Sequence, residues 1–262
     1  MREILYGRNA VYESLRAGRR KPYRLVMAEG VRQTDIVGQI VFLAEQAQVP
    51  VSRTERRNLD HLGNVHHQGV TLETSEYPYS SLDEILAVAQ SPPHRRGTDG
   101  AGGAPLLLLL DLLQDPQNVG SLLRTAEAVG VHGVVIQRRR AVGITPAVVQ
   151  TSAGAAEHLR VAQVTNLAET IDLLKAHDVW VAGLEAATGA QQADQADLSG
   201  PLALVVGSEG EGLRRLVRTR CDFLLQLPMH GQVTSLNAAV AGSVVLYEAL
   251  RQRQTWDTDG EN

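Results

Sequence analysis

Residues Leu106–Arg124 of this 262-residue chain have the sequence LLLLLDLLQDPQNVGSLLR. The opening run of leucines is short and uninterrupted, which is typical of a strand buried on both faces of a parallel sheet. Asp115, Asn118 and Arg124 follow where the chain leaves this strand and enters a helical pattern. Ligands of open α/β sheets bind outside the carboxyl ends of the strands. The stretch therefore predicts an α/β fold with ligand-binding residues at a strand-to-helix junction.

The same alternation of strand and helix patterns extends over residues 105–253. Helical patterns separate short apolar runs, and a last helix is expected over Ser235–Arg251. The expected strands are Leu106–Leu110, Gly133–Ile136, Val161–Val164, Val179–Gly183, Ala203–Gly207 and Phe223–Leu227. Strands that alternate with helices form a mostly parallel sheet with helices on both faces. Residues 254–262 are polar and are expected to form a tail.

Residues 1–76 have the pattern of a small, separate α/β domain. The expected elements are helices at Ala10–Arg16, Asp35–Gln48 and Arg56–Leu62 and strands at Tyr23–Ala28, Pro50–Ser52 and Gly69–Glu73. Residues 77–104 are expected to link this domain to the larger one. Within the linker, Ser81–Ala89 has a helical pattern with Ser80 or Ser81 as its N-cap. Residues 91–104 are rich in glycine and proline and are expected to be flexible.

The composition excludes several classes of protein. A net charge of −4 is not that of a uniformly basic nucleic-acid binder, and a hydrophobic fraction of 44% is enough for a buried core. A single cysteine, Cys221, excludes an intrachain disulfide. Because the chain shows no signal-peptide pattern and no apolar run of about 20 residues, we expect a cytoplasmic protein that does not enter a membrane. No metal site is expected, and His66 and His67 are only a weak candidate.

A second motif, Gly207–Leu213 with the sequence GSEGEGL, ends the strand predicted at Ala203–Gly207. Closely spaced glycines let the backbone turn sharply and approach a ligand. The spacing is neither that of a dinucleotide-binding GxGxxG loop nor that of a P-loop, and Glu209 and Glu211 would repel phosphates. The acidic turn favours a neutral or cationic ligand, such as an adenosine that carries a sulfonium group. An ordinary tight turn is the alternative interpretation.

A third motif, Leu227–Ala241, joins the end of a predicted strand to the start of the last helix. Thr234 or Ser235 is expected to cap this helix. Small residues follow, which would let another segment of backbone pack close to the helix. Asn237 is expected one or two residues inside the helix, where asparagine is unfavourable. This position indicates a polar side chain that faces a site, and a capped helix in a tight core is the alternative.

Together the three motifs resemble the SpoU family of RNA 2′-O-ribose methyltransferases, within the SPOUT class. The matching residues are Asp115-Pro116-x-Asn118-x-Gly120-x-x-x-Arg124, Gly207-x-Glu209-Gly210-x-Gly212-Leu213, and Leu227-Pro228-Met229 followed by Ser235-Leu236-Asn237. The sequence from Tyr6 to Leu15 is similar to the substrate-binding domain of the subgroup that modifies a guanosine of 23S rRNA. The resemblance implies a sheet tied in a deep trefoil knot and an RNA-binding N-terminal domain with an L30e-like fold.

The resemblance also implies the chemistry. S-adenosylmethionine would be the methyl donor, a ribose 2′-hydroxyl of RNA the acceptor, and the chain would form a homodimer through its knotted domain without any metal. Residues at the family's catalytic positions are Asn118, Arg124, Glu209, Ser235 and Asn237. Residues at its donor-binding positions are Gly207, Gly212, Leu227, Met229 and Leu236.

Arg124 is the residue expected to matter most for catalysis. A guanidinium group stays charged at neutral pH and makes paired hydrogen bonds to phosphates and oxyanions. We therefore expect Arg124 to bind an RNA phosphate and to stabilise the developing alkoxide, rather than to act as a free base. The 2′-hydroxyl proton would then pass to a phosphate, a water molecule or Glu209. The alternative for Arg124 is a surface ion pair with Glu127.

Other basic residues indicate where RNA could bind. Arg138–Arg140 follows the second strand of the larger domain, and Arg19–Lys21 lies in the N-terminal domain. Arg53, Arg56 and Arg57 form a third basic group. Such groups can grip phosphates, although a solvated loop is the alternative for the run at Arg138–Arg140.

Three functional alternatives accompany the main interpretation. The substrate could be tRNA instead of 23S rRNA. The chain could be a non-catalytic RNA-binding dimer, but the intact motif residues argue against this. It could also be an α/β enzyme that uses a nucleotide cofactor, which the missing phosphate-binding motif disfavours.

Overall fold

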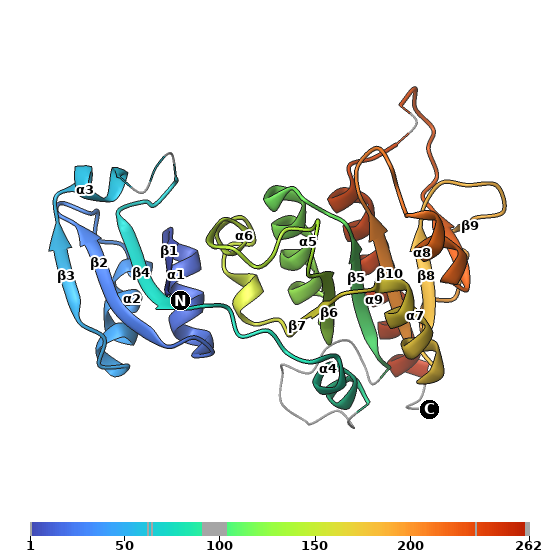
Figure 1. The fold of residues 1–262 in the computed structure, drawn as a ribbon, viewed down its shortest axis with the longest axis horizontal. Coiled ribbons are helices and arrows are strands. Elements are labelled where there is room, and N and C mark those ends of the chain that lie inside the picture. The colour runs from blue at the N-terminus through green and yellow to red at the C-terminus, as the bar shows by residue number, and fades with distance from the viewer. Residues whose placement is uncertain (1, 62, 64, 91–103, 234, 260–262) are drawn as a thin grey trace. The chain divides into compact units, whose positions relative to one another are not determined.

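The structure is a computed structural model. It describes residues 2–61, 63, 65–90, 104–233 and 235–259, with side chains up to residue 254. The chain forms two compact units, each with its own sheet (Figure 1). Unit 1 comprises Met1–Pro78 and Ile144–His158, and unit 2 comprises Tyr79–Gly143 and Leu159–Asn262. Over the described ranges, no helix has both the length and the apolar character needed to cross a membrane.

The sheet of unit 2 has seven strands, all parallel, in the order β7-β6-β5-β10-β8-β11-β9. The strands are β5 (Leu106–Asp111), β6 (Gly133–Gln137), β7 (Val161–Val164), β8 (Trp180–Leu184), β9 (Gln191–Gln192), β10 (Leu202–Gly207) and β11 (Phe223–Gln226). The leucine run forms β5, which is buried along its whole length because it lies inside the sheet. All carboxyl ends therefore lie at one edge of the sheet.

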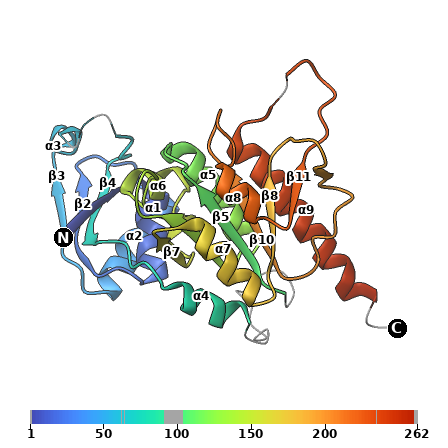
Figure 2. The ribbon, with the colours of Figure 1, turned by 45° about the vertical axis from the view of Figure 1, so that its right-hand side comes forward.

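Helices cover both faces of this sheet (Figure 2). They are α4 (Leu82–Ala89), α5 (Pro116–Ala128), α7 (Leu167–Ala176), α8 (Arg215–Arg220) and α9 (Ala238–Asp259). On one face, Ile85 of α4, Ile171 of α7 and Val217 of α8 belong to one buried apolar cluster with alternate residues of the strands, such as Leu107 and Leu109. Their neighbours in the strands point to the opposite face, because side chains of a strand alternate.

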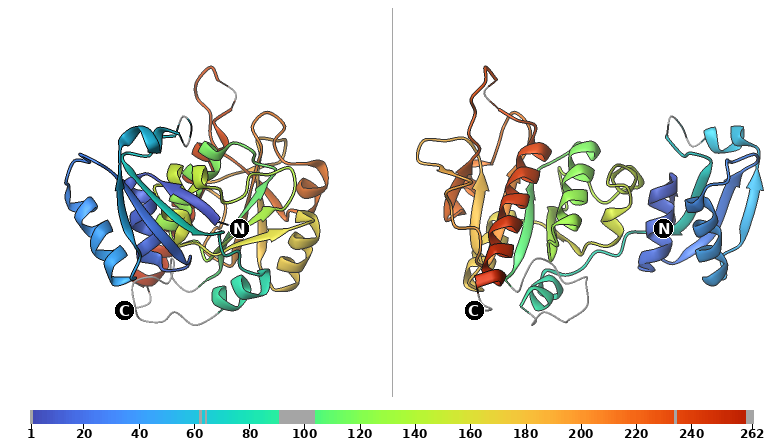
Figure 3. Two further views of the ribbon diagram at one scale, coloured as in Figure 1. Left: turned by 60° about the vertical axis from the view of Figure 1, so that its left-hand side comes forward. Right: turned by 180° about the vertical axis from the view of Figure 1, so that it is seen from behind.

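On that opposite face, α5 and α9 lie side by side (Figure 3). The hydroxyls of Thr125 and Ser243 are 2.9 Å apart. A Cβ atom at Gly242 would lie only 2.7 Å from the side chain of Leu122 and 3.0 Å from that of Val206. The small residues that follow Asn237 therefore allow α9 to pack against α5 and β10 at close range, as their pattern predicted.

Arg253 anchors the far end of α9. Its buried guanidinium donates hydrogen bonds to four backbone carbonyls, those of Ala104, Pro105, Leu198 and Gly200. Burial lowers the pKa of Arg253 to about 10. The carbonyls take the place of the water that a guanidinium normally binds, and they tie the helix to the start of β5.

Unit 1 contains a sheet of four strands in the order β1-β4-β2-β3. Its elements are β1 (Arg2–Tyr6), α1 (Arg8–Ala17), β2 (Pro22–Ala28), α2 (Asp35–Gln46), β3 (Val51–Thr54), α3 (Arg56–Asp60) and β4 (Val70–Ser75). The pairs β1–β4 and β2–β4 are antiparallel, and β2–β3 is parallel. The unit also includes α6 (Pro146–Thr151) and a 3-10 turn at Ala155–Glu157.

A buried ion pair holds this 3-10 turn in unit 1. The side chains of Arg20 and Glu157 are both fully buried and lie 2.9 Å apart, and Arg20 also pairs with Glu3. The Tyr77 hydroxyl donates a hydrogen bond to the carbonyl of Ala156 at 3.0 Å. Burial raises the pKa of Glu157 although the charge of Arg20 opposes this, and burial raises the pKa of Tyr77 to about 12.

The two units divide the chain differently from the domains expected at 1–76 and 105–253. Residues 144–158 belong to unit 1, although they lie between two strands of unit 2 in the sequence. Within the expected linker 77–104, α4 packs into the core of unit 2. The residues in 91–103, predicted to be flexible, lie outside the described part of the chain. Local patterns identify a short helix but not the apolar surface that buries it.

Most predicted elements of the sequence are present, with shifts at their ends. The helix predicted at Ser235–Arg251 instead begins at Ala238 and continues to Asp259, so the backbone of most of the expected tail 254–262 is helical. Strands β1 and β9 were not predicted. Ser81 rather than Ser80 caps α4, because its side chain accepts a hydrogen bond from the backbone of Glu84.

Candidate active site

The side-chain amide of Asn237 joins the three sequence motifs. Its Nδ2 donates a hydrogen bond to Oδ1 of Asn118 at 2.8 Å and another, short one to Oε1 of Glu209. Asn118 lies on α5, Glu209 in the loop after β10, and Asn237 just before α9. All three segments follow or meet the carboxyl edge of the parallel sheet, where α/β folds bind their ligands. The structure therefore brings three of the five predicted catalytic residues into one cluster.

Asn237 has a second role, which corrects the sequence analysis. Its Oδ1 accepts hydrogen bonds from the backbone N–H groups of Ala239 at 2.9 Å and Val240 at 3.1 Å. Asn237 is therefore the N-cap of α9 and lies before the helix, not inside it. Ser235 is not the cap, and Thr234 lies outside the described residues. Asparagine is among the preferred N-cap residues, which explains its place at this helix start.

Asn118 is positioned by the start of α5. Asp115 caps this helix, because its side chain accepts hydrogen bonds from the backbone N–H groups of Gln117 and Asn118, both at 3.2 Å. Pro116 occupies the first helical turn, where its missing N–H costs nothing. These local rules place the Asn118 side chain, which is half-buried, in the first turn of the helix.

The glycine loop Gly207–Leu213 has a tightly closed base. A Cβ atom at Gly207 would lie 2.4 Å from the backbone of Gly212, so no other residue fits there. The backbone N–H of Gly212 donates to the carbonyl of Ser208 at 3.1 Å. Gly210 and Gly212 have φ angles of 85° and 65°, in the left-handed region that favours glycine. The acidic loop is thus a tight turn whose tip, including Glu209, is exposed.

Arg124 and Ser235 are not part of the hydrogen-bonded cluster. Both side chains are exposed. Within the part of the chain that the structure describes, Arg124 forms no ion pair, so the predicted alternative of a pair with Glu127 is not found. Arg124 lies beside Thr125, which contacts α9. Because Arg124 has no ion-pair partner among the described residues, its guanidinium can bind a charged group of another molecule.

The predicted donor-binding residues lie on the two loops that also carry Glu209 and lead to Asn237. Gly207 and Gly212 form the base of the glycine loop. Leu227 is half-buried directly after β11, whereas Met229 and Leu236 are 37% and 42% exposed. Exposed apolar side chains beside a polar cluster are suited to contact a ligand with an apolar surface. No cluster of potential metal ligands occurs among the described residues.

Two residues near the site were not singled out by sequence reasoning. Asp111 ends β5 and its side chain is buried, and it binds Arg214, the residue after the glycine loop. Glu185 follows β8, and its Oε2 accepts a hydrogen bond from the backbone N–H of Leu213 at 3.3 Å. The only signal available in the sequence was an acidic residue directly after an apolar strand.

Residues 105–247 match the sequence model of the SpoU rRNA Methylase family. The chain belongs to this family. Residues 4–80 match a second model, that of RNA 2′-O ribose methyltransferase substrate binding. The chain is 43% identical over 253 residues to the TrmH family tRNA/rRNA methyltransferase YacO of Bacillus subtilis, which covers 96% of each chain. It is 42% identical over 251 residues to a TrmH family tRNA/rRNA methyltransferase of Staphylococcus haemolyticus, covering 95% of this chain and 96% of the relative. The family expected from the three motifs is confirmed, and the chain is an RNA methyltransferase.

Solved structures confirm the fold class. The SpoU methyltransferase AviRb from Streptomyces viridochromogenes matches with a TM-score of 0.77 and 24% identity, over 97% of this chain and 91% of that one. An RNA 2′-O ribose methyltransferase matches with a TM-score of 0.75 and 26% identity, over 97% and 89%. An rRNA methyltransferase from Sinorhizobium meliloti, solved with AdoMet bound, matches with a TM-score of 0.75 and 22% identity, over 95% and 87%.

Proposed function

We propose that the chain transfers a methyl group from S-adenosylmethionine to a ribose 2′-hydroxyl of RNA, at a guanosine of 23S rRNA. The observation that carries the proposal is the Asn237 amide, which joins Asn118 of α5 to Glu209 of the glycine loop. This contact assembles the three SpoU motifs at the carboxyl edge of one parallel sheet. Because ribosomal RNA is cytoplasmic, we infer that the reaction takes place in the cytoplasm.

The glycine loop fits the proposed donor. Its backbone can approach a ligand closely, because Gly207 leaves no room for a side chain and Gly212 presents none. Glu209 and Glu211 are exposed, and their charges favour a cation over a phosphate. Gly207, Gly212, Leu227, Met229 and Leu236 would hold the donor. When bound, S-adenosylmethionine supplies a methyl group that its positive sulfur already activates.

The protein residues then have to position the ribose and handle its proton. Much of the rate enhancement is expected from this positioning, because two reactants are held in line. Asn237 holds the side chains of Asn118 and Glu209, and the exposed Glu209 carboxylate is available to accept the 2′-hydroxyl proton. Arg124, charged and without an ion pair in the described chain, would bind a phosphate of the RNA and stabilise the developing alkoxide. Ser235, exposed beside the cluster, would contact the same substrate.

The role of Arg124 is tested by Arg124→Lys, with Arg160→Lys as the matched control. Both arginines are exposed in unit 2, but Arg160 precedes β7 and so lies at the opposite edge of the sheet. We expect Arg124→Lys to lower single-turnover methyl transfer to RNA by about 10- to 100-fold, because lysine keeps the charge but loses the two-pronged geometry. S-adenosylmethionine affinity, measured by calorimetry, should not change. Near-normal transfer by Arg124→Lys would rule out the paired-hydrogen-bond role.

The competing functions give different outcomes for the wild-type chain. RNA binding without incorporation of labelled methyl groups would indicate a non-catalytic RNA-binding protein. Binding of NAD but not of S-adenosylmethionine would indicate a nucleotide-dependent enzyme of another kind. Alkaline hydrolysis of the labelled RNA adds a chemical test, because a 2′-O-methyl group protects the adjacent phosphodiester bond from cleavage.

The choice of 23S rRNA rests on the N-terminal sequence. Residues 4–80 match the substrate-binding model, and the sequence Tyr6–Leu15 is similar to the 23S rRNA subgroup. Its relatives carry names that include both tRNA and rRNA. Mapping 2′-O-methyl groups in RNA from cells that lack this gene should reveal one lost guanosine methylation in 23S rRNA. Loss of a tRNA methylation instead would establish the tRNA alternative.

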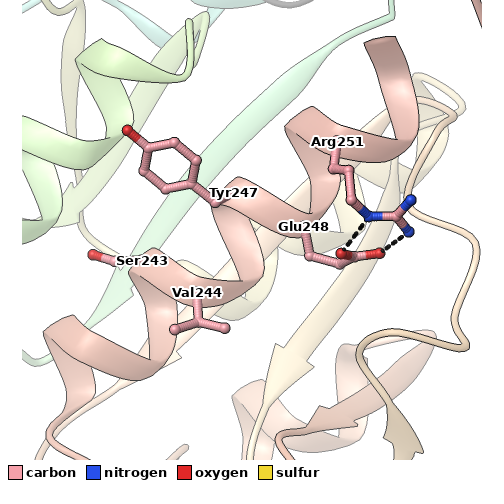
Figure 4. Close-up of a pocket in the computed structure, with 5 residues that line it drawn as sticks. All are labelled: Ser243, Val244, Tyr247, Glu248 and Arg251. Carbon is pink, nitrogen blue, oxygen red and sulfur yellow. Dashed lines mark hydrogen bonds and ion pairs between the residues drawn. The ribbon is translucent and has the colours of Figure 1, made fainter. Parts of the chain in front are cut away.

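We also propose that unit 2 forms a homodimer through α9. Val240, Val244 and Tyr247 are about half exposed, and their spacing of four and three residues puts them on one face of the helix. A shallow pocket on this helix is lined by Ser243, Val244, Tyr247, Glu248 and Arg251, whose side chains Figure 4 draws as sticks. A second copy of the same face would cover the apolar stripe, because a two-fold contact pairs a surface with itself.

The dimer is tested by Tyr247→Asp, with Trp180→Asp as the control. Both aromatic side chains are more than half exposed, but Trp180 lies on β8 and not on α9. We expect Tyr247→Asp to give a monomer in light scattering coupled to gel filtration, because a charge would be buried at the contact. The control should remain a dimer. A monomeric wild-type chain would contradict the proposal.

A further inference from the structure

Asp111 makes an unusual set of contacts at the end of β5. The residue is 1% exposed, and its carboxylate binds only one partner residue, Arg214, among the hydrogen bonds that the described chain provides. Oδ2 accepts the backbone N–H of Arg214 at 2.9 Å. Oδ1 of Asp111 accepts a hydrogen bond from Nε of Arg214 at 2.8 Å and lies 2.7 Å from its Nη2. Both carboxylate oxygens are engaged, so this acid does not serve as a proton acceptor in the reaction.

The position of Arg214 connects this contact to the glycine loop. Arg214 directly follows Gly207–Leu213 and is the N-cap residue of α8. At the other end of the loop, Gly207 is the neighbour of Asp111 in the register of β10 and β5. Asp111 therefore lies beside the first residue of the loop through its strand, and it binds the residue after the loop through its side chain. One residue thus sets the distance between the two ends of the loop.

Because Asp111 is buried, its contact with Arg214 favours the loop conformation seen in the structure over one in which the loop base is open. A buried carboxylate is costly unless it is paired and hydrogen-bonded. If the loop base opened, Arg214 would leave and the Asp111 charge would remain buried without these partners. Opening of the loop would therefore cost free energy because it leaves the Asp111 carboxylate unpaired. It would also break the hydrogen bond from the backbone N–H of Leu213 to Glu185.

We propose that Asp111 is a positioning residue for the methyl donor: it holds the base of the Gly207–Leu213 loop in the conformation that binds S-adenosylmethionine. The inference rests on the proposed function, in which this loop contacts the donor. In this proposal Asp111 is too deeply buried to be a direct ligand of the donor or of the RNA. Its effect passes through Arg214 to the backbone of the loop.

The test is Asp111→Asn, with Asp172→Asn as the matched control. Asn has the same shape but replaces one acceptor oxygen by an NH2 group that faces the Arg214 donors. Asp172 pairs with Arg220 at 2.9 Å on the surface, so the control removes an Asp–Arg pair at the opposite end of the same helix, α8. Calorimetry gives the S-adenosylmethionine Kd, and single-turnover assays at saturating donor give the rate on a 23S rRNA transcript.

We expect Asp111→Asn to raise the donor Kd about tenfold or more, the loss typical of a charge-assisted hydrogen bond. The rate at saturating donor and the affinity for the transcript should stay within about twofold of wild type. Hydrogen exchange should increase at residues 208–214 and not elsewhere. The Asp172→Asn control should match wild type in all four measurements.

Two results would overturn the inference. One is an unchanged donor Kd in folded Asp111→Asn. The other is an equal loss of donor binding, RNA binding and rate, which would show a general structural role. If Asp111→Asn does not fold, Arg214→Lys replaces it, because this variant keeps the backbone N–H bond to Asp111 and loses only the guanidinium contacts. It should raise the donor Kd less, and an unchanged Kd would again overturn the inference. Wild-type chain that binds the donor without methylating RNA would contradict the proposed function but leave this test valid.

Discussion

At the scale of single residues, Asn237 performs two tasks with one amide group. Its oxygen caps α9, and its nitrogen holds Asn118 and Glu209 together. The sequence indicated that Asn237 faces a site because asparagine is a poor helix former. The structure shows a different reason for asparagine here, since a cap needs only an acceptor whereas the cluster needs a donor on the same side chain.

Two variants of Asn237 separate these tasks. Asn237→Ser keeps a capping oxygen but removes the amide NH2 group that bonds both Asn118 and Glu209, and Asn237→Ala removes both groups. We expect both to lower methyl transfer by about tenfold or more, because Glu209 and Asn118 lose their link. Only Asn237→Ala should lose the cap. Its free energy of unfolding in urea titrations should therefore be about 1 kcal/mol lower than that of Asn237→Ser. Equal stabilities of the two variants would contradict the capping role.

Cys221 provides a pH-dependent probe of the folding of unit 2. Burial, and then the negative charge of Asp222, raise the pKa of the thiol to about 12. A raised pKa keeps the group in its neutral form below that pH, and only the thiolate reacts with iodoacetamide. At pH 8 we expect the native chain to be alkylated at least about a hundredfold more slowly than the chain unfolded in urea. Fast alkylation of the native chain would show that Cys221 is not shielded.

At the scale of elements, the loop after β6 lies beside the site. The backbone N–H of Arg138 donates to the carbonyl of Val164 at 2.9 Å, and the side chain of Gln114 donates to the carbonyl of Arg140 at 3.2 Å. Gln114 immediately precedes Asp115, the cap of α5. The side chains of Arg138–Arg140 are exposed and form no ion pair in the described part of the chain. A fixed, unpaired basic loop at this edge is suited to hold RNA phosphates near the site.

Arg139→Gln tests this loop, with Arg160→Gln as the control from the opposite edge of the sheet. Each phosphate contact that is lost should reduce the slope of log K against log salt by about 0.7 to 0.9. We expect this change, with weaker RNA binding at low salt, for Arg139→Gln only. Filter binding with an rRNA transcript at several salt concentrations gives both quantities. Equal slopes for the two variants would indicate that the loop is only solvated.

At the scale of the whole molecule, the chain builds unit 1 from two separate segments. The N-terminal segment holds residues 144–158 through the fully buried pair Arg20–Glu157, in which Arg20 lies between α1 and β2. Removing one partner of a buried ion pair is far more damaging than replacing both. Deletion of residues 1–76 would therefore also leave Glu157 unpaired, so it does not isolate RNA binding. A point change is the cleaner test of the unit.

We expect Arg20→Met to destabilise unit 1 by about 3 to 5 kcal/mol at pH 7, and Arg20→Met with Glu157→Met to recover much of this. Burial already raises the pKa of Glu157. A raised carboxyl pKa gives stability that is present below the ordinary value of about 4.3 and is lost as pH rises through the folded value. The decrease in the free energy of unfolding caused by Arg20→Met should therefore be smaller at pH 4 than at pH 7, as measured by urea unfolding. A loss that is independent of pH would exclude a charged Glu157 as its cause.

The sequence by itself determined the α/β class, the parallel sheet, the three motifs and the family. These follow from patterns within a few residues: a leucine run for a buried strand, glycines for a turn, and a proline and an aspartate for a helix start. Element ends were less predictable. The start of α9 at Ala238 depends on which residue caps it, and that was decided by the partners of Asn237. The trefoil knot was implied by the resemblance alone, because no local pattern encodes the threading of a chain.

Only the tertiary structure decided which polar groups meet. Asn118 and Asn237 are 119 positions apart in the sequence, Asp111 and Arg214 are 103 apart, and Arg20 and Glu157 are 137 apart. Their contacts depend on the order of the strands and on the surface that buries each helix. Local sequence does not encode either property, because both result from the packing of all elements together. The candidate site residues could therefore be named from sequence motifs, whereas the residues that they contact were visible only in the fold.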